Sequence, residues 1–311
     1  MEAERDLIII GGGIAGLAAA QYGARANLKV LVLEEMAAGG QIVPVTDLEN
    51  YPGFPEPIDG FELSRRFEEQ ALKFGAEFET WSARSLRKEK GLFVVETDRD
   101  SLRSASVIVA TGAKHRKLGV PGEEELGGRG VSYCATCDGP FFRGKPMLVV
   151  GGGDAACDEA MFLSKLSERV LMIHRRDRFR AQRSLAERVL ANKNIEVRFN
   201  TEIKEIQGNE RVEKVLLQDN AKGKEYTEEV AAVFVFIGSI PQTQVLQDVA
   251  LDEGGYILTD TRMETNVKGL FAAGDVRSTP FRQLVVAAAE GAIAAHSASQ
   301  YIDELRGEAY L

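Results

Sequence analysis

An internal repeat with an offset of 140 residues constrains the fold of this chain more than any other feature of its sequence. Residues 7–10 (Leu-Ile-Ile-Ile) form an apolar run that ends in a glycine-rich turn at residues 11–16. Residues 147–150 form a second apolar run, which ends in a matching turn at residues 151–156. Each turn precedes a helical stretch of about 13 residues and then another apolar run. The pattern predicts strand, turn, helix and strand, twice over.

The glycine positions in both turns are those of a dinucleotide-binding motif. The first glycine makes a tight turn, the second lets the backbone approach a pyrophosphate, and the third position must be small so that helix and strand pack closely. The pyrophosphate then lies at the helix N-terminus, where free N–H groups favour anions. One such motif is weak evidence in a chain with 31 glycines, but two in register favour dinucleotide sites over two plain tight turns. The candidate residues are Gly11, Gly13 and Gly16 in the first turn and Gly151, Gly153, Asp154, Ala155 and Ala156 in the second.

The two repeats differ at the end of the second apolar run, where nucleotide specificity is decided. In the first repeat this position is Glu34, and a carboxylate there hydrogen-bonds an unphosphorylated ribose, as in FAD or NAD. In the second repeat it is His174, followed by Arg175 and Arg176, with Arg180 nearby. Guanidinium groups donate hydrogen bonds to the 2′-phosphate of NADPH, which a carboxylate repels. The sequence therefore predicts one FAD site and one NADPH site; the alternative for the basic run is a solvated surface.

Further apolar runs complete the pattern of two dinucleotide-binding domains. Residues 107–112 and 233–238 have the character of buried strands, and each ends in a glycine. The polar stretch before each of them suits a β-meander. Residues 270–273 form another apolar run, and Asp275 just after it is a candidate to bind a flavin, with a helix N-cap as the alternative. Residues 61–74 are expected to form an amphipathic helix that packs on the core.

The spacing Cys134-Ala135-Thr136-Cys137 indicates redox chemistry. Two sulfurs at this spacing can close a short, reducible ring, and such motifs often lower the pKa of one thiol. Asp138 follows directly and could move a proton during disulfide exchange. The alternatives are a zinc site, for which the chain has too few further Cys and His ligands, or two inert buried cysteines. We expect no metal, and we expect Cys157 to be a buried, unreactive thiol.

Length and charge limit the remaining possibilities. A chain of 311 residues is better read as two domains than as one. A formal net charge of −9 argues against nucleic acid or an anionic membrane as a partner. No apolar run reaches the roughly 20 residues that a membrane-spanning helix needs. The first residues lack a signal-peptide pattern, so we expect a cytoplasmic protein.

These motifs together resemble the low-molecular-weight, bacterial-type thioredoxin reductases along nearly the whole chain. The most specific strings are Cys134–Gly139 (CATCDG) and His174–Ala181 (HRRDRFRA). Other matching stretches are residues 11–16, 39–41, 49–53, 110–112, 151–156, 271–276 and 282–283. The run Ala288–Gly291 departs from the Ala-Gly pair that is more usual in this family.

The resemblance implies an α/β fold of two Rossmann-like dinucleotide-binding domains, each a three-layer ββα arrangement. A discontinuous FAD-binding domain, residues 1–116 and 244–311, would hold an inserted NADPH-binding domain, residues 117–243, which carries the CxxC. Residues 120–122 and 239–241 would be the two hinge strands. The family also implies a homodimer whose domains swivel between two orientations.

The resemblance further implies thioredoxin-disulfide reductase activity. Hydride would pass from NADPH to FAD, then to the Cys134–Cys137 disulfide, and exchange with thioredoxin or a thioredoxin-like protein would follow. By position, Cys137 would be the sulfur nearest the flavin, Cys134 its exchange partner and Asp138 the acid/base group. FAD would be lined by Gly39, Gly40, Gln41, Asn50, Ala110, Gly112, Asp275, Arg282 and Gln283.

Two other functions fit the same motifs. The chain could be a flavin disulfide reductase that serves a glutaredoxin-like or peroxiredoxin system. It could also be a redox-sensing flavoprotein, although no DNA-binding motif or basic face supports that role.

Overall fold

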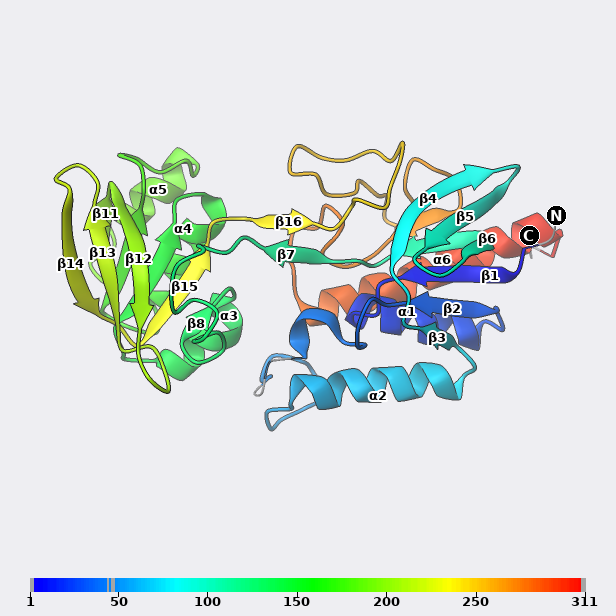
Figure 1. Ribbon diagram of the computed structural model, residues 1–311, viewed down its shortest axis with the longest axis horizontal. Helices are drawn as coiled ribbons and strands as arrows, with labels where there is room; N and C mark the ends of the chain where they lie inside the picture. The colour runs from blue at the N-terminus through cyan, green and yellow to red at the C-terminus, as the bar shows by residue number, and fades with distance from the viewer. Residues whose placement is uncertain (1–2, 44, 46–47, 309–311) are drawn as a thin grey trace. The chain divides into compact units, whose positions relative to one another are not determined.

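The structure is a computed structural model that describes residues 3–43, 45 and 48–308. It divides into unit 1, residues 1–114 and 240–311, and unit 2, residues 115–239. The chain passes between the units in β7 (Ala113–His115) and β16 (Ser239–Pro241), which pair with each other. Unit 1 therefore contains both the start and the end of the chain (Figure 1).

One of the two expected hinge strands is wrong. Residues 120–122 belong to unit 2 and form no strand, and the first connecting strand is β7 instead. Pro121 has no N–H to give to a strand ladder, and Gly122 has a left-handed φ of +84°. A Cβ at Gly122 would lie 1.9 Å from the carbonyl oxygen of Ile206, so this turn is packed tightly within unit 2.

Unit 1 is built on a seven-stranded sheet in which β6 joins two kinds of pairing. The strand order is β3-β2-β1-β6-β5-β4, with β17 also pairing with β6. β6 is parallel to β1 and β17 along its C-terminal half but antiparallel to β5 along its N-terminal half. The elements are β1 (Arg5–Ile10), α1 (Ile14–Arg25), β2 (Val30–Leu33), η1 (Gly40–Ile42), α2 (Gly60–Lys73), β3 (Glu77–Glu79), β4 (Ala83–Glu89), β5 (Leu92–Thr97), β6 (Ser101–Val109), β17 (Leu270–Ala272) and α6 (Leu284–Arg306).

Both faces of β1 are covered along residues 7–10, which explains why this part of the strand is entirely apolar. Successive side chains of a strand point to opposite faces. Leu7 and Ile9 pack with alanines of α1 and α6, whereas Ile8 and Ile10 pack with residues of β4 and β5. Unit 1 thus has helices on one face of its parallel strands and the expected β-meander on the other, which is the layered arrangement that the family resemblance implies.

Unit 2 repeats this arrangement with a separate antiparallel sheet. Its parallel sheet has the order β11-β10-β9-β15-β8, and the meander has the order β12-β13-β14. The elements are β8 (Val131–Ser132), α3 (Ala135–Asp138), η2 (Gly139–Phe142), β9 (Met147–Gly151), α4 (Asp154–Leu163), β10 (Val170–His174), α5 (Arg183–Leu190), β11 (Ile195–Phe199), β12 (Thr201–Gln207), β13 (Lys214–Asp219), β14 (Lys224–Glu229) and β15 (Ala232–Phe236).

The residues of β9 alternate between two layers in the same way as those of β1. Met147 and Val149 pack with α4, while Leu148 and Val150 pack with β12 and β13. In Figure 1 the meander strands of unit 2 stand beside the parallel strands as a separate layer. The prediction of an α/β fold with two repeated ββα units is confirmed.

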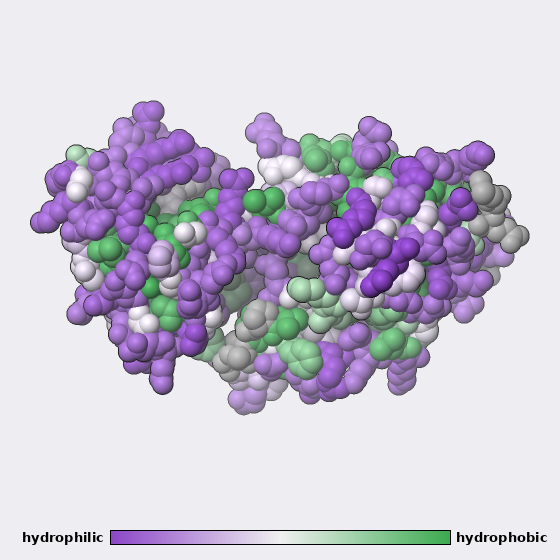
Figure 2. Space-filling model, viewed as in Figure 1, coloured by the Kyte–Doolittle hydropathy of each residue, from purple (hydrophilic) through white to green (hydrophobic). Residues whose placement is uncertain are grey.

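The face of each unit seen in Figure 2 is mostly polar. The expected amphipathic helix is α2, which buries Leu63 and Ala71. Asp59 caps its N-terminus, and the Asp59 carboxylate accepts the Glu62 N–H at 3.0 Å. Within the described ranges, no helix has both the length and the apolar character to cross a membrane.

We predict that Gly16→Ala destabilises unit 1 because α1 lies against the glycine-rich turn. A Cβ at Gly16 would lie 1.9 Å from the carbonyl oxygen of Gly11, so the helix must shift away from β1. Overpacking of this kind costs about 1–3 kcal/mol in the free energy of unfolding. Urea denaturation without added dinucleotide measures the loss.

Gly13→Ala is the matched control in the same turn. Gly13 has a φ of −69°, and a Cβ there would meet nothing within 4 Å. Its free energy of unfolding should fall by clearly less than that of Gly16→Ala. Equal losses for the two variants would contradict the close packing of helix and strand.

Candidate active site

The first glycine-rich turn lies where the C-terminal ends of β1, β2 and β6 meet. Gly11 has a left-handed φ of +106°, and a Cβ there would lie 2.4 Å from the Ala110 carbonyl oxygen at the end of β6. Glu34 follows β2, and its carboxylate accepts the Gly12 N–H at 2.6 Å and the Met36 N–H at 3.2 Å. The sequence-predicted acid is therefore at the turn, and it also orders the turn's backbone.

Hydrogen bonds join segments of unit 1 that are distant in the sequence, and residues 39 and 40 lie at the same turn. The Gly39 N–H donates to the Gly12 carbonyl at 2.8 Å, and Gly40 lies so close to Gly13 that a Cβ on it would be 3.4 Å from the Gly13 Cα. The Gln41 side-chain amide donates to the Ala113 carbonyl. The Asn50 amide donates to Gln283 Oε1 at 3.0 Å, although the two residues are 233 positions apart.

A buried ion pair fixes the loop after β17. Glu290 on α6 accepts the Gly274 N–H at 2.8 Å and the Thr279 hydroxyl at 3.1 Å, and it pairs with Arg277. Glu290 and Arg277 are about nine-tenths buried. The run in which the sequence departs from the related family therefore supplies a carboxylate that holds the candidate flavin loop. Sequence reasoning missed this role, and the only signal was a charge inside the apolar run of α6.

Asp275 lies in this loop and is not a helix cap. The helix that follows, α6, begins after Gln283. Burial raises the pKa of the Asp275 carboxyl, Arg282 lowers it, and the nearby Glu290 raises it further. The Arg282 guanidinium lies 4.1 Å from the centre of the Tyr256 ring, which orients it. Asp275 is thus a largely buried carboxyl in the loop that the Glu290–Arg277 pair holds, with Arg282 as its nearby positive charge.

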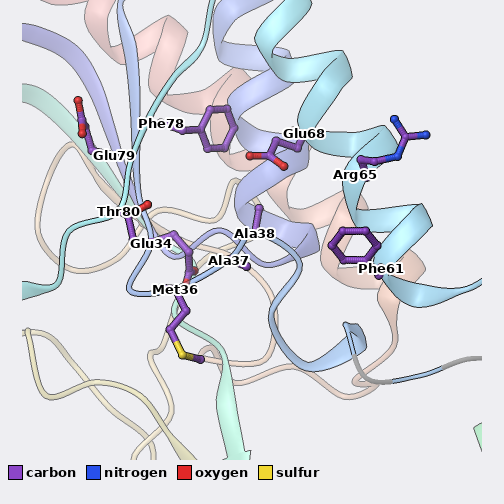
Figure 3. Close-up of a pocket in the computed structure, with 10 residues that line it drawn as sticks. All are labelled: Glu34, Met36, Ala37, Ala38, Phe61, Arg65, Glu68, Phe78, Glu79 and Thr80. Atoms are coloured by element: carbon purple, nitrogen blue, oxygen red, sulfur yellow. Dashed lines mark hydrogen bonds between the residues drawn. The ribbon is translucent and has the colours of Figure 1, made fainter.

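A cavity of about 180 Å³ lies beside Glu34, and Figure 3 shows its lining. Side chains reach it from α2, from the segment after β2 and from the end of β3. The lining residues are Glu34, Met36, Ala37, Ala38, Phe61, Arg65, Glu68, Phe78, Glu79 and Thr80. Half of these lining residues are polar, and three of them are glutamates, so the cavity beside Glu34 is acidic as well as partly apolar.

The second glycine-rich turn in unit 2 is bordered by a buried histidine and exposed arginines. His174 ends β10, and a Cβ at Gly152 would lie 2.3 Å from its Nδ1 atom. Burial lowers the pKa of His174, as do Arg180, Arg176 and Arg175, so its ring is neutral at pH 7. The Arg180 N–H donates to the Gly152 carbonyl at 2.7 Å. The predicted basic residues therefore lie at the turn.

Two buried polar atoms in unit 2 have no hydrogen-bond partner among the described residues. They are Nε2 of His174 and Oε2 of Glu159. Burial and the neighbouring Asp158 raise the pKa of the Glu159 carboxyl to about 7. Glu159 was missed from the sequence because a glutamate on a helix usually faces solvent. A buried donor or acceptor without a partner costs stability, so these atoms fit a site that a ligand completes.

The redox pair lies at the start of the short helix α3. Cys134 and Cys137 form a disulfide with a Cα–Cα distance of 5.3 Å, so they are not two separate buried thiols. The Cys134 sulfur accepts the Cys137 N–H at 3.2 Å. Burial raises the pKa of Asp138, and a 2.6 Å hydrogen bond from the Ser132 hydroxyl lowers it. Buried Cys157 has a thiol pKa raised to about 11, mainly by burial, which makes it unreactive.

A second carboxylate stabilises the segment before the cysteines. Glu123 is 2% exposed, and it accepts the Leu118 and Gly119 N–H groups at 2.8 and 2.7 Å. It also accepts the Tyr133 hydroxyl at 2.8 Å, and the Tyr133 ring stacks on His115. Sequence reasoning missed Glu123, because an acidic residue in a polar loop carries no signal of burial. Across the part of the chain that the structure describes, no cluster of Cys, His, Asp and Glu could hold a metal ion.

The two turns fit the dinucleotides that the sequence predicted. Unit 1 offers a glycine cradle with one acid at its rim, and unit 2 offers a glycine cradle with arginines and an unpartnered buried histidine nitrogen. Unit 2 also contains the disulfide. These are the parts of an enzyme that moves electrons between a pyridine nucleotide and a disulfide.

Comparison with known proteins agrees with this geometry. The sequence model of the family described as "Pyridine nucleotide-disulphide oxidoreductase" matches residues 5–291. The chain belongs to this family. The similarity to known thioredoxin reductases is also high, so the resemblance read from the sequence is confirmed.

The relatives match along almost their full length. The chain is 52% identical to a thioredoxin reductase of Treponema pallidum over 98% of this chain and 100% of that protein. It is 45% identical to a thioredoxin reductase of Bacillus subtilis over 97% of this chain and 96% of that protein. A crystal structure of thioredoxin reductase from Streptococcus pyogenes has 42% identity and a TM-score of 0.92, covering 96% of this chain and 98% of that chain.

We predict that Glu290→Ala strongly destabilises unit 1. The substitution leaves Arg277 as an unpaired buried charge and the Gly274 N–H without its acceptor, which together cost about 3–5 kcal/mol in the free energy of unfolding. Replacing both partners, as Arg277→Met with Glu290→Leu, should recover much of the loss because no lone charge remains. Chemical denaturation measures both variants.

The matched control is Glu69→Ala, which removes an exposed partner of Arg65 in the same unit. Water already solvates both of these groups, so stability should change little. If Glu290→Ala behaved like Glu69→Ala, the buried pair would not hold the loop.

Proposed function

We propose that this protein is an NADPH-dependent thioredoxin-disulfide reductase. The observation that carries the proposal is the Cys134–Cys137 disulfide in a unit that also has an arginine-bordered dinucleotide turn. FAD, when bound, accepts hydride from NADPH and passes the two electrons to the disulfide. The overall reaction converts NADPH, one proton and thioredoxin disulfide into NADP⁺ and thioredoxin dithiol.

The two dinucleotides belong to different units. We assign FAD to unit 1, where Glu34 at the rim of the turn favours an unphosphorylated ribose. Gly11, Gly13, Gly16, Gly40, Gln41, Asn50, Ala110, Gly112, Asp275, Arg282 and Gln283 would line it. We assign NADPH to unit 2, where Arg175, Arg176 and Arg180 suit its 2′-phosphate. His174, Gly151, Gly153, Asp154, Ala155 and Ala156 would complete that site.

The cysteines pass the electrons to the protein substrate by disulfide exchange. The Cys134–Cys137 bond opens to two thiols by taking up two electrons and two protons. One of the two sulfurs then attacks the disulfide of the substrate and releases one substrate thiol. The other sulfur attacks the resulting mixed disulfide, which frees the second thiol and re-forms the Cys134–Cys137 bond. Asp138, directly after Cys137, supplies and accepts protons in these steps, because burial raises its pKa toward the range of an acid/base group.

Thioredoxin or a thioredoxin-like protein is the proposed partner, since the matched relatives are named thioredoxin reductases. We also propose a cytoplasmic homodimer. Phe281, Val285 and Ile293, at and near the start of α6, are exposed apolar side chains that a second copy would cover. No observation favours a glutaredoxin-like or peroxiredoxin partner, or a sensing role.

We predict that Cys137→Ser abolishes thioredoxin reduction but leaves flavin reduction by NADPH intact. Without the Cys137 sulfur the disulfide cannot form, so electrons reach the flavin but go no further. Stopped-flow absorbance follows flavin bleaching, and a coupled assay follows thioredoxin reduction. Cys157→Ala is the control, because that buried thiol lies outside the disulfide. Thioredoxin turnover by Cys137→Ser would rule out the dithiol as the electron relay.

We predict that Arg175→Ala combined with Arg176→Ala weakens NADPH binding at least about tenfold but changes NADH binding little. A hydrogen bond to a charged group contributes about 1.5–3 kcal/mol, and only NADPH has the 2′-phosphate. Titration calorimetry with both nucleotides measures the difference. Arg188→Ala, an exposed arginine on α5 outside the basic run, should change neither affinity. Equal losses for NADPH and NADH would contradict the phosphate assignment.

A further inference from the structure

The Ser132 hydroxyl is the only side-chain group recorded within hydrogen-bond distance of the Asp138 carboxylate among the described residues. Ser132 lies in β8 and is 4% exposed. Its oxygen lies 2.6 Å from Asp138 Oδ2 and 3.2 Å from the Cys134 carbonyl oxygen. It also accepts the Cys134 N–H at 3.1 Å. One hydroxyl thus contacts both the acid/base group and the backbone of the redox cysteine.

A serine hydroxyl has one proton to donate and two lone pairs to accept with. The Cys134 N–H uses one lone pair. When Asp138 is ionised, the Ser132 proton must point to its carboxylate. When Asp138 is protonated, its own O–H can donate to the second lone pair, and the Ser132 proton is then free to turn to the Cys134 carbonyl. Ser132 keeps a partner for its proton in either state.

We propose that Ser132 is a positioning residue for Asp138. Its O–H bond points to the Asp138 carboxylate when Asp138 is ionised and turns to the Cys134 carbonyl when Asp138 is protonated, so that Asp138 can act as a base and as an acid. The inference rests on the proposed reductase function and deepens it. The Cys134 carbonyl also accepts the Asp138 N–H at 3.1 Å, at the start of α3. Protonation of Asp138 therefore changes the hydrogen bonding of the backbone next to the redox sulfur.

The Ser132 hydroxyl is the main polar group that acts on the pKa of Asp138. The pKa of Asp138 is raised by burial and lowered only by Ser132. Helix α4, which packs against α3, contains Asp154, Cys157, Asp158 and Glu159 as its titratable groups. Tyr133 follows Ser132 on the other side, and η2 has no titratable side chain. In the oxidised enzyme the two cysteines are bonded and do not titrate.

The test measures the protonation of Asp138 directly in the oxidised FAD-containing enzyme. Infrared difference spectra against Asp138→Asn isolate this carboxyl at each pH. In Ser132→Ala the ionised form loses a charge-assisted hydrogen bond, so the proton affinity of Asp138 should rise on the order of tenfold. Ser132→Thr keeps the hydroxyl and should restore the wild-type titration. The pH profile of thioredoxin reduction should move in the same direction as the infrared titration.

Ser167→Ala is the matched control for the loss of a buried hydroxyl. Ser167 is also buried, accepts the N–H two residues ahead at 3.1 Å and donates to the Lys145 carbonyl at 2.7 Å, but its hydrogen bonds are to backbone groups. It should not change the titration of Asp138. Ser132→Gly provides a second variant without the hydroxyl if Ser132→Ala does not fold.

The two hypotheses can fail separately. An unchanged Asp138 titration in Ser132→Ala or Ser132→Gly, or an equal shift in Ser167→Ala, overturns the role of Ser132. A wild-type enzyme that reduces no thioredoxin overturns the proposed function, while the infrared titration, which needs no thioredoxin, still decides the role of Ser132.

Discussion

The burial of the parallel strands on both faces is the constraint on which the rest of this structure depends. β1 and β9 each lie between helices and a β-meander, so their buried runs, residues 7–10 and 147–150, are apolar throughout. Polar side chains that bind ligands can therefore follow only after such strands end. Both glycine-rich turns, Glu34 and His174 lie at such ends. Binding groups collect at the C-terminal edge of each sheet for this reason.

The two units share this architecture and differ in the charge at the rim of the turn. In unit 1 the Glu34 carboxylate accepts backbone N–H groups of the turn region, so it orders the backbone as well as presenting an acid. In unit 2 the equivalent position is a neutral histidine whose pKa is lowered by burial and by three nearby arginines. In the proposed function, these few side chains are what give two similar backbones different nucleotides. The dithiol belongs to unit 2, within the same fold as the arginine-bordered turn.

The sequence predicted those features of the fold and of the site that depend on local patterns of residues. Alternation and glycine spacing predicted the strands, the helices and the turns, and the motif positions predicted Glu34, His174 and the cysteine pair. It did not predict Glu290, Glu123, Glu159 or Ser132, because their roles come from contacts that no local pattern specifies. Glu290 reaches back 16 residues to Gly274, and Glu123 joins a loop to Tyr133. In the sequence alone, a glutamate that the fold buries cannot be told apart from one at the surface.

The first hinge strand was misplaced for a related reason. Residues 120–122 contain a proline and a glycine, which suggest a boundary, yet Gly122 packs against Ile206 inside unit 2. The connecting strand is β7, a segment of three residues too short to show periodicity.

The most direct test of the account is the anaerobic stoichiometry of NADPH oxidation by the purified protein with limiting oxidised thioredoxin. The account predicts that one NADPH is consumed for each thioredoxin disulfide reduced, with little consumption before thioredoxin is added beyond that needed to reduce the enzyme itself. It also predicts much slower consumption with NADH. NADPH oxidation that proceeds without forming thioredoxin thiols, or no oxidation at all, would contradict the central claim that unit 2 passes electrons through its own disulfide to a protein disulfide.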